Sequence, residues 1–479
     1  MDDLLPGMLH LARDGGETLT RQLTDQLRGL ITRGRLAPGQ RLPSSRQLAQ
    51  SLGLSRNTAS FAIEQLAAEG YVTLSAGRRP EVAEGLSLDR RKLSSRSGGG
   101  GARIVLSAWA NGLQQSVWPP IHTERPRPFQ PGLADEREFP HDEWSRCLRR
   151  AARNAPLRRD RPINHPPLQE ALLSHLAVHR GIKATARQIL FVPTAQAGLA
   201  LVANALLERG DHAWVESPGY GGANVAFEAA GATVSAIPLD SHGMAISSHK
   251  TTPRLIFVTP SHQYPTGRLM PIGRRLELLR FAEAAGACII EDDYDGEFHY
   301  EARPVAALQG LAPSPRVFYL GTFSKATYAD IRIGYVVVPE TLVDTFELAQ
   351  RQMGILTSIT MQDALAEFIG AGTYLGHIRK MTRLYKGRRD RMLQALAAEA
   401  GDRLAVETPA GGMQLLARCR PHTNDRQLAA RLLEAGVVSR ALTRMLYHRN
   451  AERGLFLGFA AWNDKEIEQA ARILGKIVR

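Results

Sequence analysis

The sequence predicts a multi-domain protein, with a small helical domain followed by a large α/β domain. Residues 17–85 form helical patterns and then two short apolar runs around Gly77. From about residue 126 onward, short apolar runs such as QILFV, RLIFVTP and RVFYLGT alternate with longer helical patterns. This alternation is typical of a mainly parallel sheet with helices on both faces. A length of 479 residues also suits two or three domains.

The composition narrows the class of protein. The chain is 44% hydrophobic and 22% charged, which is ordinary for a globular protein. Its net charge of +13 agrees with a polyanionic partner, although charge alone supports DNA binding only weakly. The three cysteines lie far apart, so we expect no metal site and no disulfide framework. The sequence shows no signal peptide and no apolar run near the ~20 residues of a membrane helix, so we expect a cytoplasmic protein without membrane contact.

Three regions follow from the changes in composition along the chain. We expect a DNA-binding domain over residues 1–85, a flexible linker over 86–125 and an effector domain over 126–479. The linker contains LDRRKLSSRSGGGG, whose serines, arginines and glycines bury too little apolar surface to become ordered. A long surface loop within one domain is the alternative, which the length of the segment disfavours.

The first domain has the pattern of a helix-turn-helix. An amphipathic helix is predicted over TLTRQLTDQLRGLITRGRL. Ser44 is placed to cap a short second helix that ends at Gly53, and Ser55 to cap a third. Ala49, four residues before Gly53, is small enough for a close crossing of two helices. The inward face of the third helix consists of four apolar residues: Ala59, Ala62, Ile63 and Leu66.

The start of the third helix is the predicted reading end. In the major groove arginine recognises guanine and asparagine recognises adenine, and the helix-start amides suit a phosphate. Two short strands around Gly77 predict a wing with a basic tip. Five arginines against two acidic residues lie between Arg41 and Arg79, although a scaffold with a solvated basic face remains the alternative. The candidate DNA-binding residues are Arg41, Ser44, Arg46, Ser55, Arg56, Asn57, Thr58, Gly77 and Arg78.

The runs RLPSSRQLAQSLGLSRNTAS and EQLAAEGYV resemble the winged helix-turn-helix of the GntR family of transcription regulators. The resemblance implies that Arg46, Arg56 and Gly77 contact DNA. It also implies that double-stranded operator DNA is a partner.

Two segments of the large domain are candidates for holding a flat, phosphorylated cofactor. Thr194, Ala195 and Gln196 lie where a strand gives way to a helix, and the amides of such a helix start can hold a phosphate. Tyr220 follows another strand in a Pro-Gly loop and can stack on a heteroaromatic ring.

A third segment, CIIEDDYDGEF, ends a buried strand with acidic residues. Ligands bind at such strand ends in parallel sheets, and alternation places Asp292 and Tyr294 on one side and Asp293 on the other. A carboxylate beside a pyridine nitrogen keeps the nitrogen protonated, and a tyrosine can donate to the ring's phenolic oxygen. A metal-binding acidic cluster or a helix cap is the alternative, but neither accounts for the tyrosine or for a lysine farther along the chain.

That lysine is Lys325, which follows Thr322 and Ser324 and precedes Arg332 by seven residues. A lysine amine can form a Schiff base with a phosphorylated aldehyde, while hydroxyls and a guanidinium hold the phosphate. Most lysines in Ser-Lys pairs are solvated surface charges. The buried-strand patterns on both sides of Lys325 place it instead at a strand end.

Together these segments resemble fold-type I aminotransferases, which use pyridoxal 5′-phosphate (PLP), and the fused pair of domains resembles the MocR subgroup of GntR-type regulators. The motifs TPSHQYPTG (259–267), IIEDDYDGEF (289–298) and GTFSKATYADIRIGY (321–335) carry this resemblance. It implies PLP bound at Lys325, a head-to-tail homodimer with swapped DNA-binding arms, and control of genes for amino-acid, amine or vitamin B6 metabolism.

Two departures from the aminotransferase pattern favour a regulator that is not mainly an enzyme. Tyr264 replaces the asparagine of the Asn-Pro-x-Gly turn, and Phe456 aligns with the arginine that clamps the substrate carboxylate. Arg440 and Arg444 are interpreted as helix-face charges, with a role as substitute clamp as the alternative.

Three functions therefore remain open. The favoured one is a regulator that senses an amino acid, an amine or PLP itself through the Lys325 aldimine. The second is an active aminotransferase with an appended DNA-binding domain. The third is a DNA-binding repressor whose large domain only dimerises.

Overall fold

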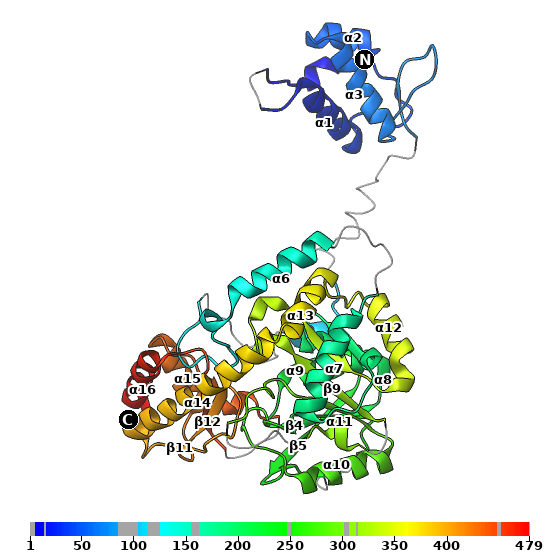
Figure 1. Cartoon of the computed structure of the whole chain (residues 1–479). Helices are drawn as coiled ribbons and strands as arrows, with labels where there is room; N and C mark the ends of the chain where they lie inside the picture. The colour runs from blue at the N-terminus through cyan, green and yellow to red at the C-terminus, as the bar shows by residue number, and fades with distance from the viewer. Residues whose placement is uncertain are drawn as a thin grey trace. The chain divides into compact units, whose positions relative to one another are not determined.

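The computed structural model describes residues 5–13, 16–84, 104–113, 125–154, 162–246, 251–300, 306–312, 315–447 and 452–478. They form two compact units, Met1–Leu106 and Ser107–Arg479 (Figure 1). The division falls inside the stretch predicted as a linker. Most of that stretch lies outside the described residues, and its described part contains a short helix, α5 (Ala108–Gly112).

The first unit is a helix-turn-helix with a two-stranded wing. Its regular elements are the 3₁₀ turn η1 (Pro6–Met8), α1 (Leu19–Thr32), α2 (Ser45–Leu52), α3 (Arg56–Ala68), β1 (Val72–Thr73) and β2 (Glu81–Val82). The predicted caps are present: Ser44 caps α2, Ser55 caps α3, and Gly53 ends α2 in the left-handed conformation with φ 62°. The strands β1 and β2 pair antiparallel on either side of Gly77.

The core of this unit comes from the apolar faces that the sequence predicts. Leu23 and Leu27 of α1 are fully buried. The four inward positions of α3 are buried as well: Ala59, Ala62, Ile63 and Leu66. The helices of the helix-turn-helix are therefore determined by patterns within short stretches of sequence, namely the spacing of apolar residues and the capping residues.

The second unit is built on an eight-stranded sheet of order β3-β10-β9-β8-β7-β4-β5-β6. The strands are β3 (Ile189–Val192), β4 (His212–Ser217), β5 (Thr233–Asp240), β6 (Gly243–Met244), β7 (Leu255–Val258), β8 (Cys288–Asp292), β9 (Val317–Thr322) and β10 (Gly334–Val337). The central strands pair parallel, as predicted, whereas β10 runs antiparallel to both β3 and β9.

Helices cover both faces of this sheet (Figure 1). They are α7 (Pro166–Arg180), α8 (Ala195–Leu206), α9 (Gly221–Ala229), α10 (Ile272–Ala285), α11 (Leu308–Leu311), α12 (Val343–Gln352) and α13 (Ile359–Gly370), while α6 (His141–Asn154) packs on α13. Consecutive residues of β8 belong to different core clusters: Ile289 packs with residues of α10, and Ile290 with residues of α8, α9 and α12. This two-sided burial explains why the strand sequences are continuous apolar runs.

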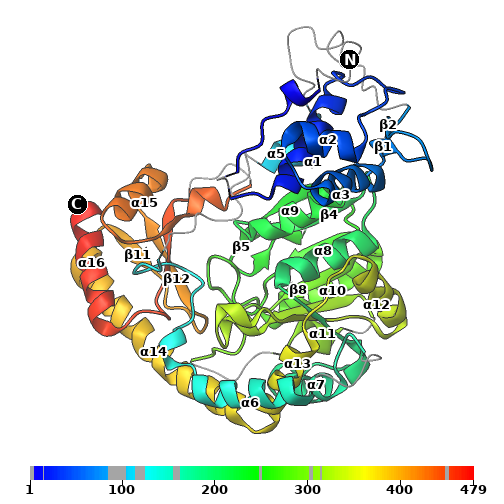
Figure 2. The ribbon, with the colours of Figure 1, turned by 90° about the horizontal axis from the view of Figure 1, so that it is seen from above.

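A smaller antiparallel sheet of order β11-β12-β14-β13 completes the unit. Its elements are β11 (Leu404–Val406), β12 (Gln414–Cys419), β13 (Arg440–Ala441), β14 (Gly454–Gly458), α14 (Thr373–Ala400), α15 (Asp425–Glu434) and α16 (Asp464–Val478). Figure 2 shows α14 and α16 side by side next to this sheet. The pairing of β13 with β14 places Arg440 opposite Phe456.

None of the helices in the described ranges combines the length and the hydropathy that crossing a bilayer requires.

A close approach of α8 to the sheet gives a first testable prediction. A Cβ atom on Gly198 would lie 2.7 Å from Leu320 Cδ1 and 3.0 Å from Val336 Cγ2, and both neighbours are buried. We expect Gly198→Ala to lower the free energy of unfolding by about 1–3 kcal/mol through overpacking, seen as a lower thermal midpoint.

The matched control is Gly273→Ala in α10, where a Cβ atom meets nothing within 4 Å. It should not lower the midpoint, because alanine is the better helix former. Equal midpoints for the two variants would contradict the tight contact at Gly198.

Candidate functional site

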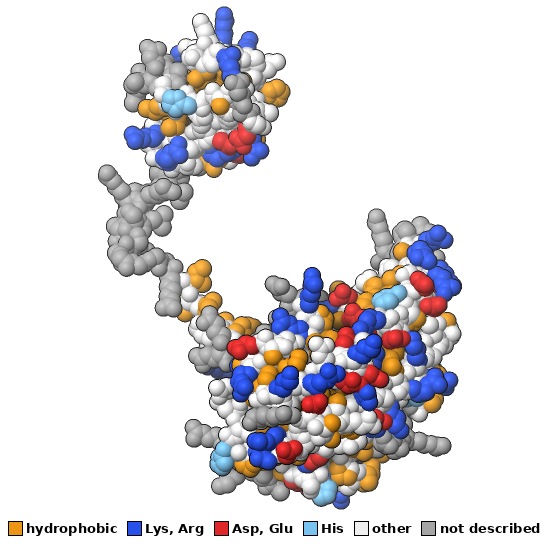
Figure 3. Space-filling view, turned by 90° about the vertical axis from the view of Figure 1, so that its left-hand side faces the viewer, with side chains coloured by type: hydrophobic (Ala, Val, Ile, Leu, Met, Phe, Trp, Pro, Cys, Tyr) orange, Lys and Arg blue, Asp and Glu red, His pale blue; other side chains and the backbone are white. Residues whose placement is uncertain are grey.

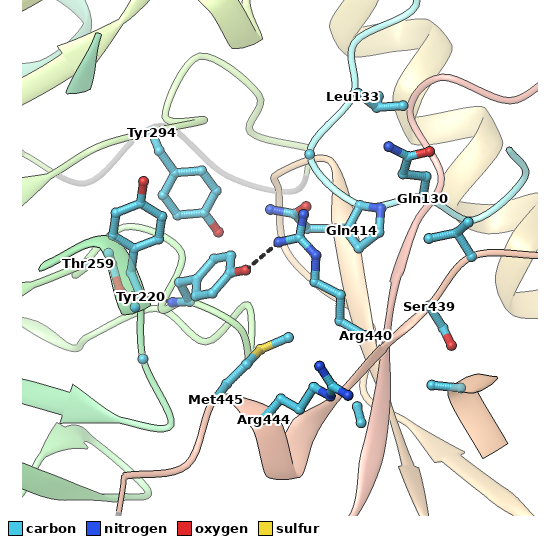
Figure 4. A pocket seen from close by; sticks show the side chains of 18 of the residues that line it. Gln130, Leu133, Tyr220, Thr259, Tyr294, Gln414, Ser439, Arg440, Arg444 and Met445 are labelled. Atoms are coloured by element: carbon cyan, nitrogen blue, oxygen red, sulfur yellow. Dashed lines mark hydrogen bonds between the residues drawn. The ribbon is translucent and has the colours of Figure 1, made fainter. Parts of the chain in front are cut away.

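A cavity of about 560 Å³ opens beside the ends of β8 and β9 and the strands of the small sheet. Six of the predicted cofactor residues line it: Ala195, Tyr220, Asp292, Tyr294, Thr322 and Lys325. Figure 4 shows Tyr220, Thr259 and Tyr294 on one side of the cavity and Gln130, Leu133 and Ser439 on the other, with Arg440 and Gln414 between them. Segments far apart in the chain therefore converge on one space.

Lys325 ends the 3₁₀ turn η7 (Phe323–Lys325) that follows β9. Its Nζ donates a hydrogen bond to the carbonyl oxygen of Gly132, 2.5 Å away. Desolvation and then the charge of Arg440 lower the pKa of Lys325 to about 8, against the raising effect of nearby carboxylates. A lysine with a lowered pKa has more neutral, nucleophilic amine near pH 7 than an ordinary lysine.

Asp292 is the last residue of β8, and its side chain is buried. Its Oδ1 has no hydrogen-bond partner among the described residues. Desolvation, reinforced by Asp293 and Asp295, raises the pKa of Asp292 to about 8. Since buried polar atoms are nearly always hydrogen-bonded, a carboxyl group in this state fits a ligand nitrogen with which it can share a proton.

The neighbouring acidic residues have partners of their own. Asp293 Oδ2 lies 2.6 Å from Arg180 Nε and accepts from the Tyr319 hydroxyl at 2.5 Å. Asp295 pairs with His262 at 2.8 Å. The predicted alternation is thus confirmed, because Asp292 and Tyr294 line the cavity and Asp293 does not. Within the described ranges, no three His, Cys, Asp or Glu side chains are grouped so that they could hold a metal ion.

An aromatic wall lies beside these groups. The ring of Tyr264 meets those of Tyr220, Tyr294 and Phe456 at centroid distances of 5.8, 5.9 and 5.1 Å, in each case edge to face. Tyr220 lies after strand β4 and directly before the first residue of α9. Burial raises the pKa of both Tyr220 and Tyr294, so both keep their hydroxyl protons. The wall offers flat faces and O–H donors to an aromatic ligand.

The predicted phosphate end is only partly assembled in the cavity wall. Ala195, the first residue of α8, lines the cavity, and so does Thr322, whose Oγ1 accepts from the Ser324 amide at 3.2 Å. A Cβ atom on Gly334 would lie 3.1 Å from the Gly321 oxygen and 3.4 Å from the Ala195 nitrogen. Glycine therefore keeps the space beside the start of α8 open.

Four predicted residues do not line the cavity: Thr194, Gln196, Ser324 and Arg332. The Thr194 hydroxyl caps α8 by accepting from the Ala197 amide, and the Gln196 amide donates to the Gly222 oxygen at 2.8 Å. Arg332 has left-handed backbone with φ 48°, two residues before β10, and its side chain is exposed. Arg332 thus lies outside the lining of this cavity, and its role at the phosphate stays a prediction.

The interpretation of Arg440 as a helix-face charge was wrong. Arg440 belongs to strand β13 and lines the cavity, where its Nη1 donates to the Tyr264 hydroxyl at 2.9 Å. Arg444 lies in the 3₁₀ turn η10 (Leu442–Arg444) and also borders the cavity. Sequence reasoning missed Gly132 and Gln414 as well. The run VVSRAL shows no alternation of apolar and polar residues, so its two β-branched valines were the available signal for a strand at Arg440.

The candidate DNA-binding residues of the first unit are largely at its surface. Arg46 and Arg56, at the starts of α2 and α3, are exposed, as is Asn57. The Ser55 hydroxyl accepts from the Thr58 amide at 3.0 Å, and Ser44 forms a capping box with Gln47.

The wing adds a second group of such positions. Gly77, with φ 73°, and Arg78 are exposed at the wing. The Nε atom of Arg41 lies 3.8 Å from the Oε2 atom of Glu81 in β2. Figure 3 shows basic side chains on the surface of this unit. Ser44 and Ser55 thus hold the helix starts that present the arginines.

Both units match known families. Residues 19–82 match the gntR family of bacterial regulatory proteins. Residues 134–474 match the family of class I and II aminotransferases. The chain is 36% identical over 474 residues to the probable rhizopine catabolism regulatory protein MocR of Rhizobium meliloti, covering 98% of this chain and 95% of that protein. It is 29% identical over 453 residues to the pyridoxine biosynthesis transcriptional regulator PdxR of Corynebacterium glutamicum, covering 93% of each.

A comparison with solved structures also finds the aminotransferase fold. The chain resembles the kynurenine aminotransferase of Pyrococcus horikoshii with a TM-score of 0.68 and 25% identity, covering 80% of this chain and 97% of that one.

A winged helix-turn-helix joined to an aminotransferase-like domain defines a class of transcription regulators. The chain belongs to the GntR family of transcription regulators, and within it to the MocR subgroup, which it matches along both domains. The fold class predicted from the sequence is thereby confirmed. PLP is the usual cofactor of the aminotransferase class I and II family.

Proposed function

We propose that this regulator binds PLP at Lys325 and senses a small amino acid, amine or PLP itself in the same cavity. The signal changes its binding to operator DNA upstream of genes for amino-acid, amine or vitamin B6 metabolism. The observation that carries the proposal is that Lys325 and Asp292 line one cavity, each with its pKa shifted to about 8.

The residues present fit PLP. Asp292 Oδ1 lacks a partner among the described residues, which suits a protonated ring nitrogen. Tyr220 offers a face to the ring, and Tyr294 can donate to the phenolic oxygen. The open space beside Ala195 and Gly334 suits a phosphate at a helix start.

When bound, PLP supplies an aldehyde that an amine can attack and a ring that withdraws electrons. The chain supplies the rest: Lys325 presents an amine that loses its proton more readily than that of an ordinary lysine, and Asp292 holds a proton at the ring nitrogen. The aromatic wall of Tyr220, Tyr264 and Tyr294 excludes water from one side of the cavity.

The test uses the purified full chain and DNA from upstream of its own and neighbouring genes. Addition of PLP should produce a visible absorption band, and PLP or an amine should change the affinity for that DNA. A spectral change with PLP but with no amine would identify PLP as the effector. A chain that stays colourless and binds DNA independently of PLP would refute the proposal and favour a repressor whose large domain only dimerises.

An active aminotransferase is the second candidate function. It is favoured by the joint presence of Lys325, Asp292 and Tyr294 in the cavity wall. Against it, the clamp position holds Phe456, which is 1% exposed and packed against Tyr264 and Met445. Turnover of an amino acid with a keto acid at roughly 1 per second or faster would favour the enzyme.

The proposal includes a head-to-tail homodimer with swapped DNA-binding arms. It rests on the resemblance to the MocR subgroup. The molar mass measured by analytical ultracentrifugation, with and without PLP, tests the dimer, and a monomer under both conditions would remove it.

The pH dependence of PLP capture gives a second testable prediction. Because the pKa of Lys325 is lowered from 10.5 to about 8, the amine is protonated below pH 8 and neutral above it. The rate at which the absorption band forms should therefore rise through pH 8 and then level off, as stopped-flow absorbance can show. A midpoint near 10.5, the ordinary value for lysine, would show that the cavity does not shift this amine.

A further inference from the structure

Arg440 is a cation in the cavity wall without an acidic partner. Its Nη1 donates to the Tyr264 hydroxyl at 2.9 Å, and no carboxylate in the described part of the chain forms an ion pair with it. Figure 4 shows its guanidinium directed toward the tyrosine side of the cavity. A half-buried guanidinium that has only a neutral partner retains donors for an anion.

The strand register explains how this arginine comes to be there. Arg440 of β13 is paired across the sheet with Phe456 of β14. Phe456 packs its ring on Tyr264, the residue whose hydroxyl accepts from Arg440. At the clamp position the chain thus has an apolar ring, and the guanidinium stands on the neighbouring strand instead.

Other polar atoms beside Arg440 also lack partners. The hydroxyl of Ser439, the adjacent residue, is buried and has no hydrogen-bond partner among the described residues, although Ser439 lines the cavity. Gln414 Oε1 also lacks a partner among the described residues, and as an acceptor it suits an N–H group of the ligand and not its acidic group. A hydroxyl can donate to an anion, and buried polar atoms are seldom left unpaired. These atoms provide evidence for a ligand that is independent of the charge of Arg440.

We propose that Arg440 determines effector specificity by binding the acidic group of a small primary amine that carries a carboxylate or a sulfonate. The inference rests on the proposed function, because the amine end of the effector would meet the PLP held at Lys325. It names the effector class and assigns its recognition to a residue of β13 rather than of β14.

The same charge links the acidic group to the lysine. Arg440 is the second largest cause, after desolvation, of the lowered pKa of Lys325. An anion bound to Arg440 offsets its positive charge, so the pKa of Lys325 should rise when the acidic group is in place. A mutation that removes the charge of Arg440 should also raise the pKa of Lys325.

The test uses three probe amines of similar size with the PLP-loaded full chain: β-alanine, taurine and n-propylamine. The change in the visible absorption band gives the affinity for each. In the wild type at least one anionic probe should bind about tenfold or more tighter than n-propylamine, and the better of the two shows whether a carboxylate or a sulfonate is preferred. Arg440→Gln should remove this preference while the PLP band remains.

Two further variants separate recognition from structure. Arg431→Gln, an exposed arginine on α15, should keep the preference. Arg440→Lys should retain the positive charge and part of the preference, because lysine binds anions as a point charge. Stopped-flow capture of PLP without any amine should show a higher pH midpoint for Arg440→Gln and a smaller change for Arg440→Lys.

Two results would contradict the role of Arg440. Equal binding of all three probes by the wild type, or a preference that survives in Arg440→Gln, would overturn the role of Arg440. Failure of the proposed function looks different, because the wild type would then show no PLP band before any amine is added.

Discussion

The variant Lys325→Ala is expected to lose the visible absorption band of bound PLP completely. Lys325 is the lysine that lines the cavity in the described part of the chain, and its amine is the group able to attack the aldehyde. Spectra of the full chain with excess PLP, and its mass after borohydride reduction, measure the loss directly. Wild-type protein should gain the mass of one reduced cofactor and the variant none.

The loss should not come from unfolding. Lys325 Nζ makes one hydrogen bond, to the Gly132 oxygen, and a typical hydrogen bond contributes only about 0.5–1.5 kcal/mol. The control Lys380→Ala removes an exposed lysine that pairs with Glu138. Because surface ion pairs contribute little to stability, this substitution should change the free energy of unfolding only slightly and should leave the absorption band intact. A band of full intensity in Lys325→Ala would show that another amine holds PLP.

The parts of the fold that the sequence predicted depend on neighbours in the chain. Ser44 and Ser55 bond amides three residues away, and Gly53 adopts the left-handed conformation that ends a helix. The placement of Asp292 and Tyr294 follows from the alternation of side chains beyond a strand end. Such patterns are contained in short windows, so a single sequence is enough to find them.

The parts that the sequence did not predict depend on distant pairing. Arg440 enters the cavity because β13 pairs with β14, and this register also sets it opposite Phe456. Gly132 reaches Lys325 across 193 residues. The spacing of Arg332 from Lys325 predicts a phosphate ligand, but it did not indicate the left-handed backbone and the exposed side chain that this residue has. Neither helical nor strand periodicity carries information on these contacts.

Replacement of Arg56 by alanine should weaken operator binding by about 1–3 kcal/mol, roughly 5- to 150-fold. Arg56 is the first residue of α3 and is exposed, so the substitution removes no buried contact. The Ser55 cap stays in place, and alanine is a good helix former. The fall in affinity would therefore report a lost DNA contact rather than a damaged fold. Fluorescence anisotropy at one fixed salt concentration, on operator and on unrelated DNA, measures it.

The ratio of the two affinities determines what Arg56 contacts. A base-reading arginine lowers the affinity for the operator much more than that for unrelated DNA, whereas a phosphate contact lowers both alike and reduces the salt dependence. PLP uptake should stay at the wild-type level, since Arg56 belongs to the other unit. Arg431→Gln, which removes one positive charge from the large unit, controls for net charge. Unchanged affinity for both DNAs would mean that the start of α3 does not face DNA, and the recognition role would pass to other exposed basic residues such as Arg46 and Arg78.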